Sequence, residues 1–169
     1  MKLIILGAGG HGQVVADLAR QTGRYEEVLF LDDKAEGSDV VGTCADYIRF
    51  QNQDIEMYPA FGNNAGRIQW ENKILDGGIT LAAIIHPLAY VSPRAEIAAG
   101  CVIMPYAVVN TGTILKKACI INIGALVDHD CILEEGCHLA PGAVVKGENH
   151  LPEGTKVDSG QVVPLQYYK

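Results

Sequence analysis

Asp128-His129-Asp130 is the part of this sequence whose residue types are best suited to acid–base chemistry. A carboxylate beside a histidine can hold one ring nitrogen protonated and make the other nitrogen a stronger base. The same triplet also occurs in ordinary polar turns, so its spacing leaves both interpretations open. His138 follows nine residues later, at a position expected to point outward, where it can meet His129 only across or between chains.

A second candidate site is the glycine-rich segment Gly7-Ala8-Gly9-Gly10-His11-Gly12. Backbone N–H groups at the start of a helix bind phosphate oxygens, and glycines let a ligand approach the backbone closely. The alternative is that these glycines only allow a helix and a strand to pack. His11 either contacts a ligand from within the turn or is a solvated loop residue.

Two further groups are expected to face the same ligand. Asp32 follows Gly12 by twenty residues, the spacing at which an acid at the end of a second strand faces a nucleotide. Asp32 and Asp33 are candidates to accept hydrogen bonds from ribose hydroxyls or a base N–H, or they are simple turn acids. Gly62 and Asn63, at the next junction of strand and loop, are expected to line the same crevice.

An α/β module is expected to position these groups. Residues 2–6 and 28–31 read as buried strands, and a helix between them ends at Gly23. The buried face of that helix is expected to carry Val14, Val15, Leu18 and Ala19.

The rest of the module follows the same alternation. A capping box at 43–46 predicts a short helix, and Asn64 is expected to cap a longer helix that ends at Gly77. A last strand is expected over 79–85. The first 80 or so residues therefore predict three or four parallel strands, with room for one nucleotide more easily than two.

The second half of the chain repeats every six residues. An aliphatic side chain occupies each sixth position: Ile85, Val91, Ile97, Ile103, Val109, Leu115, Ile121, Val127, Leu133, Leu139, Val145, Leu151, Val157 and Val163. Six residues form one short strand and one corner, and three such units close a coil of a parallel β-helix. Small residues precede most of the aliphatic ones by two positions. Four of them are cysteines, expected to be buried thiols: Cys101, Cys119, Cys131 and Cys137.

Composition restricts the classes of partner. The chain has 169 residues, of which 49% are hydrophobic and 20% charged, as in a folded protein of one or two domains. Its net charge of −7 argues against a nucleic-acid partner. The apolar run at 3–6 is too short for a membrane span or a signal sequence, so we expect a cytoplasmic protein that does not bind a membrane.

With both modules in view, the chain resembles the bacterial sugar acyltransferases with a left-handed β-helix. It is most similar to the nucleotide-amino-sugar N-acetyltransferases and the sialic acid O-acetyltransferases. The resemblance covers residues 1 to about 147, through GAGGHG (7–12), FLDD (30–33), GNNAGR (62–67), VIMPYAVVN (102–110), IIN (120–122) and VDHDC (127–131).

The resemblance implies an α/β plus all-β fold. Residues 1–84 are expected to form a Rossmann-like domain that binds a nucleotide-linked sugar, and residues 85–169 a left-handed parallel β-helix with the acyltransferase activity. It also implies a homotrimer, with acetyl-CoA as acyl donor in the groove between adjacent β-helices. The reaction is expected to need no metal.

The resemblance also assigns roles to particular residues. His129 is expected to be the general base that deprotonates the sugar amine, or hydroxyl, and Asp130 to raise its basicity. Contacts with the nucleotide sugar are expected from Gly9, Gly10, His11, Asp32, Asp33 and Gly62. His138 and the backbone near Gly147 are expected to contact acetyl-CoA, and Asn122 to line the site.

The sequence departs from the family pattern near its end. After Val145 the segment 146–150 breaks the small-residue rule, and the chain ends where family members add coils that form part of the CoA groove. A nucleotide-sugar-binding protein without efficient acetyl-CoA binding therefore remains an alternative. Two other classes fit less well. A zinc carbonic anhydrase would need a close histidine pair that this sequence lacks, and an NAD-dependent oxidoreductase would need a larger sheet.

Overall fold

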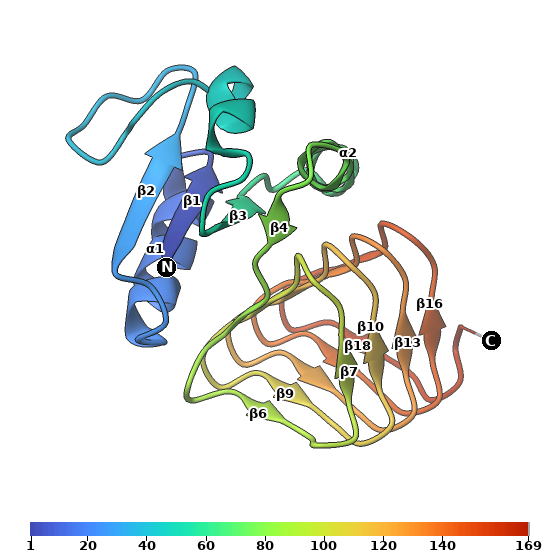
Figure 1. Cartoon of the computed structure of the whole chain (residues 1–169). Coiled ribbons are helices and arrows are strands. Elements are labelled where there is room, and N and C mark those ends of the chain that lie inside the picture. Colours follow the sequence, from blue (N-terminus) through green and yellow to red (C-terminus); the bar gives the residue numbers. More distant parts are fainter. Residues whose placement is uncertain (169) are drawn as a thin grey trace. The chain divides into compact units, whose positions relative to one another are not determined.

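A computed structural model describes residues 1–168, and the chain divides into two compact units, Met1–Ala82 and Ala83–Lys169 (Figure 1). The expected boundary followed residue 84. The difference arises because the predicted strand over 79–85 is two strands, β4 (Thr80–Leu81) and β5 (Ile84–Ile85). β4 pairs with the sheet of the first unit, whereas β5 pairs with a strand of the second.

The first unit is a parallel four-stranded sheet in the order β2-β1-β3-β4. Its other strands are β1 (Lys2–Leu6), β2 (Glu27–Leu31) and β3 (Ile55–Pro59), and its helices are α1 (Gly10–Gln21), the 3₁₀-helix Cys44–Phe50 and α2 (Asn64–Asp76). Leu6 pairs in register with Leu31 and with Pro59. The carboxyl ends of β1, β2 and β3 are therefore level, and the loops that follow them meet at one edge.

Two local expectations in this unit were wrong. Val14 is 44% exposed, because only Val15, Leu18 and Ala19 of the predicted face turn toward the sheet. Asn63, not Asn64, caps α2: its Oδ1 accepts a hydrogen bond from the Gly66 N–H at 2.7 Å.

The second unit is the β-helix that the six-residue period predicted. Its short strands are β5, β6 (Tyr90–Val91), β7 (Glu96–Ile97), β8 (Val102–Ile103), β9 (Val108–Val109), β10 (Ile114–Leu115), β11 (Ile120–Ile121), β12 (Leu126–Val127), β13 (Ile132–Leu133), β14 (His138–Leu139), β15 (Val144–Val145), β16 (His150–Leu151), β17 (Lys156–Val157) and β18 (Val162–Val163). They form three parallel sheets, in which each strand pairs with the strand eighteen residues away. Figure 1 shows the coils stacked along one axis.

The interior of the β-helix contains the aliphatic side chain of each unit and the small side chain two positions earlier. All five cysteines of the chain are free and buried. The Cys137 thiol donates a hydrogen bond to the Pro152 carbonyl at 3.2 Å, and other thiols make the same kind of contact. Asn149 fills the small position where the sequence pattern breaks, and its amide donates to the Pro164 carbonyl at 2.9 Å. The repeat thus continues through the irregular segment.

From Gly100 onward, the corners of the β-helix have a left-handed backbone at every sixth residue. Positive φ angles occur at Gly100, Tyr106, Gly112, Ala118, Gly124, Asp130, Gly136, Gly142, Glu148, Gly154, Gly160 and Gln166. Glycine adopts this conformation without steric cost, which explains its frequency there. Asp130 adopts it with a φ of 54°, although a side chain makes that conformation less favourable.

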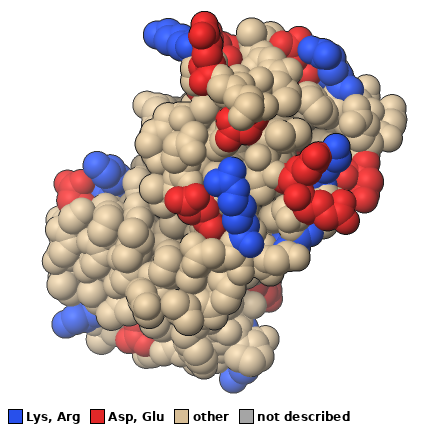
Figure 2. Space-filling model, turned by 90° about the vertical axis from the view of Figure 1, so that its left-hand side faces the viewer, with Lys and Arg blue, Asp and Glu red and all other residues tan. Residues whose placement is uncertain are grey.

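Charged side chains of both signs are mixed on the surface (Figure 2). On the face of the molecule in Figure 2, Lys and Arg side chains lie among Asp and Glu side chains, so this face presents no extended basic patch. None of the helices within residues 1–168 is long and apolar enough to cross a membrane.

Candidate active site

His129 and Asp130 form a hydrogen-bonded pair at the corner that follows β12. The His129 Nδ1 lies 2.9 Å from the Asp130 Oδ2, and the His129 side chain is 41% exposed. The carboxylate accepts the hydrogen bond, so Nδ1 carries the proton and Nε2 keeps its lone pair. The triplet thus has the arrangement of a general base.

The surroundings of His129 make it a stronger base than an isolated histidine. Its pKa is raised, first by the hydrogen bond to Asp130 and then by the negative charge of Asp128. Asp128 is itself kept ionised, because the backbone N–H of His129 and the amide of Asn110 donate to its carboxylate and lower its pKa.

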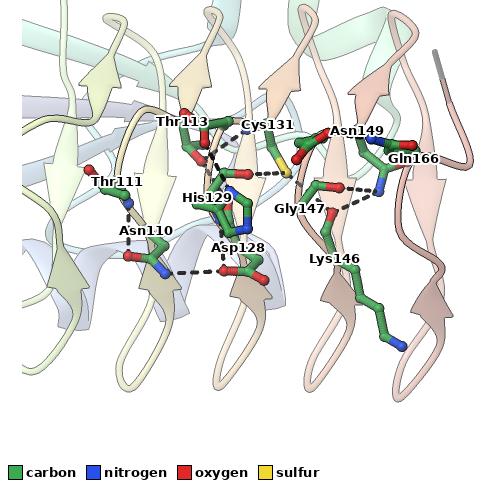
Figure 3. Close-up of polar contacts among 12 residues, drawn as sticks. Asn110, Thr111, Thr113, Asp128, His129, Cys131, Lys146, Gly147, Asn149 and Gln166 are labelled. Atoms are coloured by element: carbon green, nitrogen blue, oxygen red, sulfur yellow. Dashed lines mark hydrogen bonds and ion pairs between the residues drawn. The ribbon is translucent and has the colours of Figure 1, made fainter.

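Gly147, in the next coil, lies directly against the His129 ring (Figure 3). A Cβ atom at this position would be 2.8 Å from the His129 Nε2, which is too close for carbon and nitrogen. Gly147 was expected to contact acetyl-CoA through its backbone. Within this chain it leaves the space that the imidazole occupies.

A groove of about 330 Å³ lies beside this corner, on the sheet that contains β12. Its lining residues are Val108, Asn110, Leu126, Val127, Asp128, Val144, Val145 and Lys146. The outer positions of the same sheet form an outer apolar column of Tyr90, Val108, Leu126, Val144 and Val162, which are in register on successive coils. Leu126 is 40% exposed and Val162 is 50% exposed, so the column offers apolar surface to a partner.

Asn122 and His138 form a second polar pair. The Asn122 Nδ2 lies 3.4 Å from the His138 Nε2, and both side chains are partly buried. Asn122 follows β11 and His138 is in β14, whereas His129 follows β12 in another sheet. The chain therefore holds these two predicted residues together as a group separate from His129.

The glycine-rich turn of the first unit contains glycines of two kinds. A Cβ on Gly12 would be 1.9 Å from the Gly7 carbonyl oxygen, and Gly7 has a φ of 97°, so the packing of helix on strand requires both. A Cβ on Gly9, Gly10 or Gly62 would meet nothing within 4 Å. These three glycines, all predicted ligand contacts, therefore border open space at the carboxyl edge of the sheet.

The two acids after β2 support the loops around this edge. Asp32 accepts hydrogen bonds from the N–H groups of Ala8 at 2.7 Å and of Lys34 and Ala35, which lower its pKa. Asp33 accepts from the Cys44 N–H at 2.9 Å. Asp32, Ala35, Glu36, Gly37, Val40 and Gly42 line a hollow of about 300 Å³. Both predicted ligand residues thus have a structural role, and so does Asn63 as a helix cap.

His11 lies in the first turn of α1 and is partly buried. Burial and the neighbouring Arg67 guanidinium lower its pKa to about 4, so it is neutral near pH 7. Within residues 1–168 its buried Nε2 has no hydrogen-bond partner, and its ring is 6.3 Å from that of Tyr58. His11 is therefore not the solvated loop residue of the alternative interpretation.

Sequence reasoning missed two groups that shape these sites. Arg67 is fully buried and donates hydrogen bonds to the Phe61 carbonyl and the Asn64 side chain, which fixes the loop after β3. Asn110 contacts Asp128 across one coil. The spacing of eighteen residues, which is one coil, could have predicted that Asn110 and Asp128 lie side by side. Within residues 1–168 no three His, Cys, Asp or Glu side chains are grouped to hold a metal ion.

Known proteins share both units. The family model of the PglD N-terminal domain matches residues 2–74. The acetyltransferase domain of PglB from Neisseria gonorrhoeae FA1090, solved with acetyl coenzyme A, is 40% identical, with a TM-score of 0.94; the similarity covers 98% of this chain and 82% of that one. The chain therefore belongs to the family of sugar acetyltransferases that join a PglD N-terminal domain to a left-handed β-helix.

Two other solved structures extend the comparison. PerB from Caulobacter crescentus, in complex with CoA and GDP-perosamine, is 29% identical with a TM-score of 0.88, covering 97% of this chain and 89% of that one. WeeI from Acinetobacter baumannii AYE is 23% identical with a TM-score of 0.83, covering 97% and 81%, and shares the fold. These comparisons confirm the family and the fold class that the sequence motifs predicted.

Proposed function

We propose that this chain transfers the acetyl group of acetyl-CoA to an amine, or less favourably a hydroxyl, of a nucleotide-linked sugar. The observation that carries the proposal is the His129–Asp130 pair, in which the carboxylate holds Nδ1 at 2.9 Å and leaves Nε2 as the base. The relatives support the co-substrates, since PglB was solved with acetyl coenzyme A and PerB with CoA and GDP-perosamine.

In the proposed reaction the His129 Nε2 removes a proton from the sugar amine as the amine nitrogen attacks the thioester carbonyl. The new C–N bond forms, the C–S bond breaks, and the CoA thiolate takes the proton from the imidazolium. Asp130 stabilises the imidazolium, because its carboxylate lies 2.9 Å from Nδ1. The mechanism needs no covalent acyl-enzyme.

The nucleotide sugar is proposed to bind at the glycine-rich turn. Gly9 precedes α1 without a side-chain cap, so N–H groups of the first turn can donate to phosphate oxygens. Open space beside Gly9, Gly10 and Gly62 supports a ligand here. His11 is proposed to face the ligand as a neutral hydrogen-bonding group, while Asp32 and Asp33 hold the surrounding loops.

Acetyl-CoA is proposed to bind in the groove between adjacent β-helices of a homotrimer. His138 and the backbone near Gly147 are proposed to contact acetyl-CoA, and Asn122, whose Nδ2 lies 3.4 Å from the His138 Nε2, is proposed to line the sugar site. The exposed outer apolar column supports a homotrimer. An apolar surface of this kind is stabilised when it is covered, and a second copy of the β-helix could cover it. We propose that the protein is located in the cytoplasm.

The test is a transfer assay with acetyl-CoA and a panel of UDP-, GDP-, dTDP- and CMP-linked amino sugars. Release of CoA together with an acetylated product of one of these sugars is the expected result. Thermal shift with the same panel identifies the nucleotide, because a bound ligand stabilises the native state. Binding of a nucleotide sugar without acetyl-CoA binding in calorimetry would instead support the noncatalytic alternative.

A further inference from the structure

The corner that carries His129 is tied to the preceding coil by side chains (Figure 3). The Asn110 Nδ2 donates to the Asp128 Oδ1 at 3.1 Å, and the Thr113 hydroxyl donates to the Asp128 carbonyl at 2.8 Å. The same Asp128 Oδ1 accepts the backbone N–H of His129 at 2.8 Å. One carboxylate oxygen thus links Asn110 to the main chain of the proposed base.

Asn122 is the residue with which the two side-chain contacts of Asn110, through Oδ1 and through Nδ2, can be compared. Both asparagines accept the N–H of the next residue through Oδ1 at 2.8 Å, which is a local turn contact. An aspartate can make that contact equally well. The Nδ2 group is therefore the distinctive part: in Asn110 it donates to Asp128, and in Asn122 it faces His138.

We infer that Asn110 is a positioning residue for His129, acting through the carboxylate of Asp128. The inference rests on the proposed function. The Asn110 donor fixes the orientation of the Asp128 carboxylate, and that carboxylate fixes the backbone from which the imidazole projects. Gly147 bounds the ring on the opposite side. Because transfer rates are sensitive to small displacements of a catalytic group, this link is expected to affect turnover more than substrate binding.

The test uses Asn110→Asp alone and combined with Asp128→Asn. The single variant keeps the turn acceptor but places two carboxylates together, and we expect kcat to fall roughly tenfold or more with an unchanged KM. The double variant exchanges amide and carboxylate and conserves the net charge. A turn of the new amide at position 128 lets its Nδ2 donate to the carboxylate at position 110 and leaves its Oδ1 to accept the His129 N–H, which in wild type shares one oxygen with Asn110. Partial recovery of kcat, above that of the single variant, is expected, as for a direct coupling between the two side chains.

Ser92→Ala is the matched control. Ser92 is one coil before Asn110 at the same corner position and, like it, makes a local contact, with the Arg94 N–H at 3.3 Å. This variant is expected to keep wild-type kcat. A single variant with wild-type kcat, or a folded double variant that shows no recovery, would overturn the inference.

A second measurement separates this inference from the proposed function. At a pH well above the His129 pKa, ¹⁵N NMR of the ring is expected to show a bare Nε2 and a protonated Nδ1 in wild type. A mixture of tautomers is expected in Asn110→Asp, because a displaced ring loses its contact with Asp130. The double variant is expected to move the ring signal back toward that of wild type. This readout needs no turnover, so it remains informative if the wild-type protein transfers no acetyl group. Identical ring signals in all three proteins would contradict the positioning role.

Discussion

Asp130 combines an unfavourable backbone with a functional contact. Gly112, Glu148 and Gln166 have the same left-handed conformation at this corner of other coils, and the Asp130 side chain meets the ring of His129. Residues in such conformations cost of order 1–3 kcal/mol and persist where the surrounding structure holds them. At Asp130 this corner geometry places a carboxylate beside the proposed base.

Replacing Asp130 by asparagine tests the role of this carboxylate through pH dependence. The free base must be deprotonated, so kcat/KM falls as the pH drops through the pKa of His129. Asp130 raises that pKa, and Asp130→Asn is therefore expected to shift the acidic limb to lower pH. The plateau is expected to fall by about tenfold, because the base is weaker. An acidic limb at the wild-type pH would contradict this role, and Glu153→Gln, an exposed acid elsewhere in the β-helix, is the control.

At the level of elements, the six-residue period was enough to predict the strands of the β-helix. The period fixes which side chains point inward, and eighteen residues fix which strands pair. Residue spacing alone could not show which of the two acids binds His129, because that depends on the left-handed turn at Asp130; only the family resemblance indicated Asp130. The roles of Asp32 and Asp33 also required coordinates, since their partners are backbone N–H groups brought close only by folding.

Two glycines of the glycine-rich turn are expected to respond differently to replacement by alanine. Gly12→Ala is expected to destabilise the chain by about 1–3 kcal/mol, because its Cβ would overlap the Gly7 carbonyl. Gly10→Ala has open space and is expected to keep the wild-type melting temperature while weakening nucleotide-sugar binding by roughly tenfold or more. Thermal unfolding and calorimetry measure the two effects. Unchanged nucleotide-sugar affinity in Gly10→Ala would remove this turn from the proposed binding site.

For the whole molecule, the outer apolar column is the surface that a homotrimer is proposed to cover. Leu126→Glu places a charge in its centre and is expected to give a smaller species than wild type in analytical ultracentrifugation, because burying an unpaired charge is costly. Leu75→Glu is the control, since Leu75 is similarly exposed, at 46%, but belongs to α2. A trimer of normal stability in Leu126→Glu would place the subunit interface on another face.

The most direct test of the account is the turnover number of His129→Ala with acetyl-CoA and the nucleotide-linked amino sugar identified by the transfer assay. We expect kcat to fall by about two orders of magnitude or more, the usual contribution of a general base. Nucleotide-sugar affinity and oligomeric state are expected to remain as in wild type, because the His129 side chain is partly exposed and outside the core. A kcat within about threefold of wild type would contradict the assignment of His129 as the base.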